Sequence, residues 1–134
     1  RREVVSVTSA MLDPAYGIEG DHYDGRSGKR HVTLIQAEHL PVIAALAGLE
    51  TVDPAELRRN IVVSGLNLAA FRGKRLQLGS AVVELTVPCH PCSKMETVLG
   101  QGGYTAMRGH GGMCACVVAP GAISTGAAVL PAGG

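Results

Sequence analysis

One stretch sets the architecture expected for this chain: Arg75-Leu76-Gln77-Leu78-Gly79-Ser80-Ala81-Val82-Val83-Glu84-Leu85-Thr86-Val87, which continues into Pro88-Cys89-His90-Pro91-Cys92. Apolar residues alternate on both sides of Gly79-Ser80, and this pattern predicts two antiparallel strands joined by a tight turn. The second strand ends where the pair Cys89 and Cys92 begins. We therefore expect a hairpin that leads into two thiols facing a site.

Short strands are also predicted along the rest of the chain. β-branched or alternating runs indicate strands at 3–9, 31–35, 60–65, 113–119 and 129–130, and helical patterns occur at 37–46, after Asp53 and at 92–99. A long Gly-rich loop is expected between them, from Ala10 to Lys29. Many short strands without regular strand-helix alternation favour a mainly β (α+β) fold. We expect a closed or curled β-barrel with a few short peripheral helices, as one domain over residues 1–134.

The composition excludes several classes of partner. Twelve basic and eleven acidic residues give a formal charge of +1, which supplies no broad positive field for DNA or RNA. Aromatic residues make up 3% of the chain and Trp is absent, so stacking platforms for single strands are scarce. No apolar run reaches the length of a membrane helix, and no signal-peptide pattern opens the sequence. We expect a cytoplasmic protein that binds neither nucleic acid nor membrane.

The four cysteines carry the most specific chemistry. Because no secretory signal is seen, Cys89, Cys92, Cys114 and Cys116 indicate metal, redox or sulfur chemistry rather than disulfides. A cysteine at a strand end, near basic groups and a helix N-terminus, can be held as the reactive thiolate. Three alternatives stay open. The cysteines could pack as small hydrophobes, the Cys89-Cys92 pair could be a redox dithiol, or Cys114 and Cys116, on one face of a strand, could complete a zinc site.

Basic residues occur at two strand starts. Arg58-Arg59-Asn60 lies where a short helix turns into a strand, and guanidinium groups pair readily with phosphate or carboxylate oxygens. Arg30-His31 precedes another strand, and Asp21 lies in the loop before it. These groups could converge if the barrel brings their ends together, although each could also be an ordinary helix end, turn cap or strand residue. His110, between two glycines, is expected to be an exposed loop residue.

Together these segments resemble a MOSC domain, the module found in molybdenum cofactor sulfurases, amidoxime-reducing proteins and free-standing bacterial proteins. The matching pieces are short but keep their order along almost the whole chain. They are Gly20-Asp21, Arg30 to Leu34, Arg59 to Gly65 with Leu68, Gly73, Leu78-Gly79, Pro91-Cys92, Gly111-Gly112 and Gly121-Ala122-Ile123.

The resemblance implies a barrel-like fold and a role in handling molybdenum cofactor or transferring sulfur. The family's characteristic cysteine falls on Cys92, which would ligate molybdenum or hold a persulfide. The set implied to bind the anionic cofactor is Asp21, Arg30, His31, Arg58, Arg59 and Asn60, of which the Arg59-Asn60 pair matches the family motif directly. The basic groups would keep the Cys92 thiol ionised, and Asn60 would orient the ligand.

The resemblance also implies partners. A cysteine desulfurase would donate sulfur, and a molybdenum enzyme or a metal-sulfur assembly protein would receive it. Pyridoxal phosphate is not expected, because the sulfurase domain that would bind it is absent from this sequence. His90-Pro91 and Gly126-Ala127 depart from the family pattern and weigh against reductase activity. The alternatives are a non-catalytic structural or zinc-binding domain and a dithiol redox protein.

Overall fold

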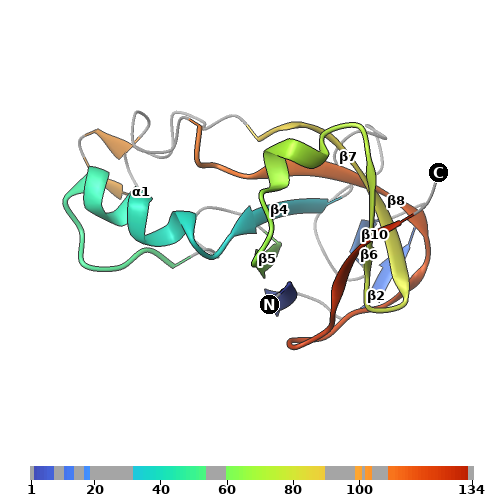
Figure 1. The fold of residues 1–134 in the computed structure, drawn as a ribbon. Helices are drawn as coiled ribbons and strands as arrows, with labels where there is room; N and C mark the ends of the chain where they lie inside the picture. The colour runs from blue at the N-terminus through green and yellow to red at the C-terminus, as the bar shows by residue number, and fades with distance from the viewer. Residues whose placement is uncertain are drawn as a thin grey trace.

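The computed structural model describes residues 2–7, 11–13, 17–18, 32–53, 60–89, 99–100, 102–103 and 109–132, and the structural statements below concern these residues. Figure 1 shows their arrangement. The elements are β1 (Glu3–Val7), β2 (Met11–Asp13), β3 (Gly17–Ile18), β4 (Val32–Gln36), α1 (His39–Ala47), β5 (Ile61–Ser64), the 3₁₀ helix η1 (Leu68–Phe71), β6 (Arg75–Leu78), β7 (Ala81–Pro88), β8 (Met113–Ala119), β9 (Gly121–Ala122) and β10 (Val129–Ala132).

Seven strands of the described residues form one curled sheet in the order β1-β5-β4-β8-β7-β6-β10 (Figure 1). Neighbours are antiparallel except β4 and β5, which run parallel because α1 supplies the crossover between them. The sheet curls until its ends meet: Glu3 forms a bridge with Ala128, and the Val129 amide donates to the Arg2 carbonyl at 3.2 Å. The result is a nearly closed barrel, which confirms the mainly β fold expected from the sequence.

The predicted hairpin around Gly79-Ser80 is confirmed. β6 and β7 pair with Leu78 opposite Ala81, so Gly79 and Ser80 form the two-residue turn. Alternate residues of both strands are buried in the barrel interior, as the period of two requires. The interior is filled by aliphatic side chains from every barrel strand, among them Val4, Leu34, Val63, Leu76, Leu85, Ala115 and Val129.

A second apolar cluster lies on the outside of β4 and β5, where α1 covers the sheet. Ile35 and Val62 point away from the barrel interior and pack with Ile43 of α1 and with Leu99. The helix ends at Gly48, whose φ of 74° gives the left-handed cap expected there. No described helix is both long enough and apolar enough to cross a membrane.

The structure departs from the expected Ala10–Lys29 loop. β2 and β3 lie within it, and β2 pairs with β9, more than a hundred residues later, to form a separate three-stranded sheet. The helices expected after Asp53 and at 92–99 fall almost wholly outside the described residues.

Candidate functional site

A hollow of about 240 Å³ opens at one end of the barrel, where β4 runs into α1. Its described wall is built from four separate parts of the chain. They contribute Gln36 and His39 from the β4–α1 junction, Leu68 and Ala69 from η1, Pro88 and Cys89 from the end of β7, and Gly109, Gly111, Gly112 and Met113 from the turn before β8 and its first residue. Among these described lining residues none carries a fixed charge, so this part of the wall suits a small, neutral and largely apolar molecule.

Gln36 fixes one wall of the hollow. It is the buried polar residue of the described chain, with 8% of its surface exposed, and its side-chain oxygen accepts a hydrogen bond from the Leu68 amide at 3.0 Å. This bond supplies a partner for an amide at the start of η1 that the short 3₁₀ helix cannot satisfy itself. The bond therefore holds η1 against β4 and keeps the hollow's wall in place.

Cys89, which lines the hollow, contacts a second buried thiol, Cys114. The sulfurs of Cys89 and Cys114 lie 3.3 Å apart, and both side chains are nearly inaccessible. Cys114 points out of the barrel because its neighbours Met113 and Ala115 point into the core. Cys89 is held at the end of β7 by its amide, which donates to the Gly112 carbonyl at 2.9 Å. The two sulfurs meet because β7 and β8 are neighbouring strands.

Asn60, directly before β5, and Thr33 of β4 continue the outer face of the barrel beyond Cys114. The side-chain oxygen of Asn60 accepts hydrogen bonds from the Thr33 amide at 2.9 Å and the Thr33 hydroxyl at 3.1 Å. The Asn60 amide in turn donates to the Thr33 hydroxyl at 2.9 Å. Thr33 lies opposite Cys114 in the β4–β8 ladder, so their side chains share the outer face. Asn60, Thr33, Cys114 and Cys89, which we call the outer row, are therefore contiguous.

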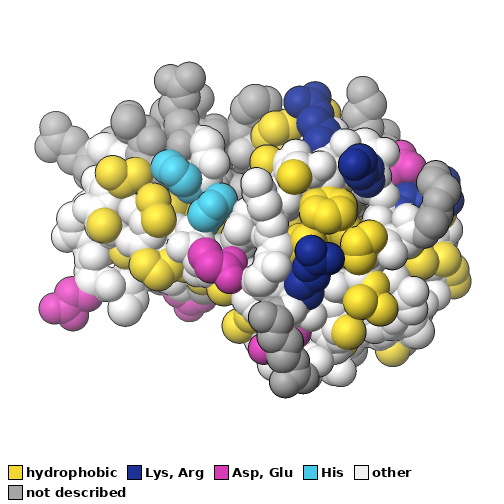
Figure 2. All heavy atoms as spheres, viewed as in Figure 1, with side chains coloured by type: hydrophobic (Ala, Val, Ile, Leu, Met, Phe, Trp, Pro, Cys, Tyr) yellow, Lys and Arg dark blue, Asp and Glu magenta, His cyan; other side chains and the backbone are white. Residues whose placement is uncertain are grey.

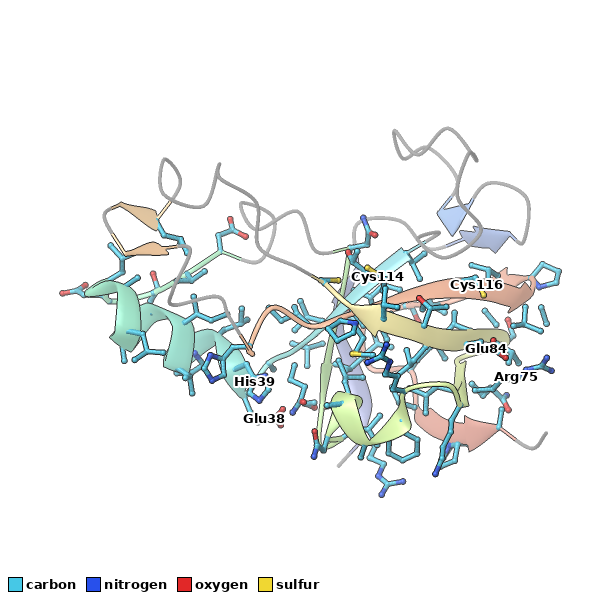
Figure 3. All side chains as sticks on the ribbon, turned by 90° about the horizontal axis from the view of Figure 1, so that it is seen from above. Glu38, His39, Arg75, Glu84, Cys114 and Cys116 are labelled. Atoms are coloured by element: carbon cyan, nitrogen blue, oxygen red, sulfur yellow. The ribbon has the colours of Figure 1, made fainter. Side chains whose placement is uncertain are left out.

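Cys116 lies further along β8 than Cys114, toward Glu84, as Figure 3 shows, and it is not part of the outer row. It faces the same side of β8 as Cys114 but is opposite Glu84, which pairs with Arg75 at 3.3 Å. Burial, and secondarily the Glu84 carboxylate, raise the pKa of the Cys116 thiol. This thiol is therefore protonated and weakly nucleophilic at neutral pH. Within the described residues no group of three or more His, Cys, Asp or Glu side chains is arranged to hold a metal.

Two histidines meet beside the hollow. The rings of His39 and His110 are 5.5 Å apart and nearly perpendicular, and Figure 2 shows two cyan histidine side chains next to each other on this face of the molecule. Burial, followed by the charge of His110, lowers the pKa of His39, although Glu38 opposes this. His39 is therefore neutral at pH 7. His110 was expected to be exposed, but it is half-buried against His39.

Glu38 provides a prediction on pH. Its carboxylate accepts a hydrogen bond from the Gly65 amide at 2.9 Å, and this bond is the main reason that the pKa of Glu38 is lowered from 4.5. A lowered folded-state pKa stabilises the protein above pH 4.5, and the contribution is lost as the pH falls through the folded value. We expect Glu38→Gln to reduce the free energy of unfolding at pH 7 by about 0.5–1 kcal/mol, because the group is exposed.

Urea denaturation of both proteins at pH 7 and at pH 3 checks this expectation. The difference between wild type and Glu38→Gln should shrink at the lower pH, because pH 3 lies below the ordinary pKa of 4.5 and the contribution of the lowered pKa is being lost there. An undiminished difference at pH 3 would mean that the carboxylate charge contributes nothing.

Only one of the predicted site residues lies in the described part of the chain. Asn60 is described, at the start of β5, where it bonds to Thr33. The others, Asp21, Arg30, His31, Arg58, Arg59 and Cys92, lie outside the described residues, and their roles stay predictions. Sequence reasoning did not find the hollow, the Gln36 contact or the histidine pair, because each joins residues that are distant in the chain.

Comparison with known proteins establishes the family. The family model of the MOSC domain matches residues 19–130, so the chain belongs to the MOSC family. A search of the curated proteins finds no match.

Solved structures share the fold at low sequence identity. The YuaD protein from Bacillus subtilis is 20% identical, with 96% of each chain covered and a TM-score of 0.72. YiiM from Escherichia coli is 23% identical, with 99% of this chain and 69% of that chain covered and a TM-score of 0.76. YiiM from Geobacillus stearothermophilus is 17% identical, with 99% and 76% covered and a TM-score of 0.77. At these identities the likeness concerns the fold.

Proposed function

We propose that this MOSC-family protein carries sulfur as a persulfide on Cys92. The observation that supports this most directly is the outer row, in which contacts lead from Asn60 through Thr33 and Cys114 to Cys89. Asn60 belongs to the family's arginine-asparagine motif, and Cys89 begins the segment with the family cysteine. The outer row therefore leads, along one face of the barrel, from the arginine-asparagine motif to the segment that carries the family cysteine.

Cys92 follows Cys89 by three residues in the sequence. Three residues of extended chain span at most about 11 Å, so the covalent chain allows Cys92 to reach the outer row. The proposal places its sulfur at the barrel end that carries the hollow. The donor or acceptor of the sulfur would approach there.

The same reasoning applies to the basic residues. Arg59 directly precedes Asn60, and His31 is two residues before Thr33, so both basic segments are adjacent in sequence to residues that the Asn60–Thr33 bonds join. Positive charge favours the thiolate over the thiol, because it stabilises the charged form. We infer that Arg30, His31, Arg58 and Arg59 keep the Cys92 thiol ionised and attract an anionic ligand, and that Asp21 belongs to the same set of ligand-binding residues.

Molybdenum cofactor handling is the second candidate, and membership of the MOSC family supports it. A soft thiolate such as that of Cys92 suits molybdenum. The hollow alone does not fit the anionic cofactor, because none of its described lining residues is Lys or Arg. Arg30, Arg58 and Arg59 would have to bind the phosphate, and Cys92 would supply the ligand to the metal. Copurifying pterin fluorescence, seen after oxidation, would favour this candidate.

Sulfur loading of Cys92 tests the first proposal. After incubation with a cysteine desulfurase and L-cysteine, intact-protein mass spectrometry should show one added sulfur atom, and peptide mapping should assign it to Cys92. We expect Cys92→Ser to reduce loading to background, because serine cannot form a persulfide.

Cys116→Ser is the matched control, since Cys116 is a protonated thiol apart from the outer row, and it should load like wild type. Equal loading of Cys92→Ser and wild type would contradict the carrier role. The sulfur donor, and a molybdenum enzyme or metal-sulfur assembly protein as recipient, are part of the same proposal, as is a cytoplasmic location.

A further inference from the structure

Cys89 and Cys114 form a pair of thiols that does not include Cys92, the cysteine to which the proposed function assigns sulfur. The two sulfurs are already in contact at 3.3 Å, and a disulfide bond of about 2.05 Å requires them to approach by only roughly 1.2 Å. Both belong to the barrel face, Cys114 within β8 and Cys89 directly after β7. Their 25-residue separation in sequence is closed by the β7–β8 pairing.

The surroundings give the two thiols unequal access. Cys89 lines the hollow and is 7% exposed, whereas Cys114 is 2% exposed and lies behind it, outside the described lining. A small molecule in the hollow therefore meets Cys89 first. His39 lines the same hollow, and its neutral imidazole can accept a proton.

We infer that Cys89 and Cys114 form a redox-active pair in which Cys89 attacks a small, neutral disulfide in the hollow and Cys114 completes an internal disulfide. In the first step the Cys89 thiolate attacks R–S–S–R, forming a Cys89–S–S–R bond and releasing one thiolate RS⁻. In the second step the Cys114 thiolate attacks the Cys89 sulfur, forming Cys89–S–S–Cys114 and releasing the second RS⁻. The two protein thiols are oxidised, the small disulfide is reduced to two thiols, and the two protein protons end on them.

The inference does not require Cys92 to carry sulfur, but it has a consequence for that segment. An internal disulfide would tie the first residue of the Cys89-His90-Pro91-Cys92 segment covalently to β8. Oxidation would then restrict the part of the chain that carries the family cysteine. The pair is also distinct from a Cys89–Cys92 dithiol, since its partner is on another strand.

The test uses 2-hydroxyethyl disulfide, which is small enough to enter the hollow, on the Cys92→Ser/Cys116→Ser variant. This protein keeps only Cys89 and Cys114, both unaltered, so the inference does not depend on a core substitution that prevents folding. We expect the monomer to lose both titratable thiols and two hydrogen atoms in mass, with recovery of both thiols after reduction. A monomer that keeps both thiols, or keeps a stable adduct on each, would overturn the inference.

Mapping in the wild-type background assigns the bond. Trypsin leaves Cys89 and Cys92 together in peptide 76–94, and Cys114 and Cys116 together in peptide 109–134. A cross-link between these two peptides does not show which cysteines form it, so variants are needed to assign the bond. The cross-link should persist in Cys92→Ser and in Cys116→Ser and disappear in Cys89→Ala. In Cys114→Ala the mixed disulfide on Cys89 should accumulate. A cross-link that survives Cys89→Ala or Cys114→Ala would overturn the pairing, whatever the sulfur loading of Cys92.

Discussion

Replacing Gly112 with alanine is expected to lower the free energy of unfolding by about 4 kcal/mol or more, the largest effect foreseen for a single substitution in this chain. Gly112 has a φ of +91°, which L residues rarely adopt. An added Cβ would also collide with the Leu34 carbonyl oxygen and lie 2.9 Å from its carbon. These are backbone atoms of β4, held in the β4–β8 ladder, so they cannot move aside without breaking the barrel. Because the chain lacks Trp, far-ultraviolet circular dichroism in urea is the suitable measurement.

Gly109 supplies the matched control in the same turn. Its φ is +81°, but an added Cβ would meet nothing within 4 Å. Gly109→Ala therefore has the conformational strain without the collision, and it should cost about 1–2 kcal/mol. Equal destabilisation by the two substitutions would show that the approach of Gly112 to β4 has no energetic importance.

Gly112 also connects the fold to the candidate site. Its carbonyl accepts the Cys89 amide, and its Cα lies against β4 next to the hollow. The close approach that excludes a side chain at this position is therefore what brings Cys89 onto the outer row. This close approach explains why the chain has glycine at position 112, within the Gly111-Gly112 segment that contributes to the MOSC resemblance.

The parts of the fold that follow from local pattern were predictable. β6 and β7 alternate strictly around a Gly-Ser turn, and α1 ends at a glycine that caps it. In contrast, β2 and β9 are two or three residues long and form only because they pair across the chain. η1 likewise depends on the buried Gln36 side chain. No local periodicity indicates elements whose hydrogen-bond partners are so distant.

The candidate site, like the fold, has parts that local sequence pattern predicts and parts that it does not. Alternation along β8 places Cys114 and Cys116 on one face, as the sequence predicts, but it does not show that only Cys114 reaches Cys89. That contact depends on strand order, which alternation does not specify. The pairing of His39 with His110 has the same origin, since the β4–α1 junction and the turn before β8 become neighbours only in the finished barrel.

Substituting Asn60 with alanine is expected to lower the free energy of unfolding by about 2 kcal/mol, the second-largest effect. The Asn60 side-chain oxygen accepts from both the amide and the hydroxyl of Thr33, and alanine would leave these part-buried donors without that partner. The loss falls at the beginning of β4 and β5, the parallel pair of strands in the barrel sheet. Urea denaturation measures the change, and sulfur loading of Cys92 should fall with it because the barrel face loosens.

Asn60→Asp separates the two roles that this residue could have. Aspartate keeps the accepting oxygens, so the bonds to Thr33 should survive and stability should stay within about 1 kcal/mol of wild type. Aspartate cannot donate through an amide and adds negative charge next to Arg59, so a ligand-orienting role predicts that sulfur loading falls although stability is kept. If Asn60→Asp loads sulfur at the wild-type level, Asn60 only connects β4 to β5 and does not orient the ligand. If Asn60→Asp were as unstable as Asn60→Ala, the hydrogen bonds accepted by the side-chain oxygen would not be what stabilises the connection between β4 and β5.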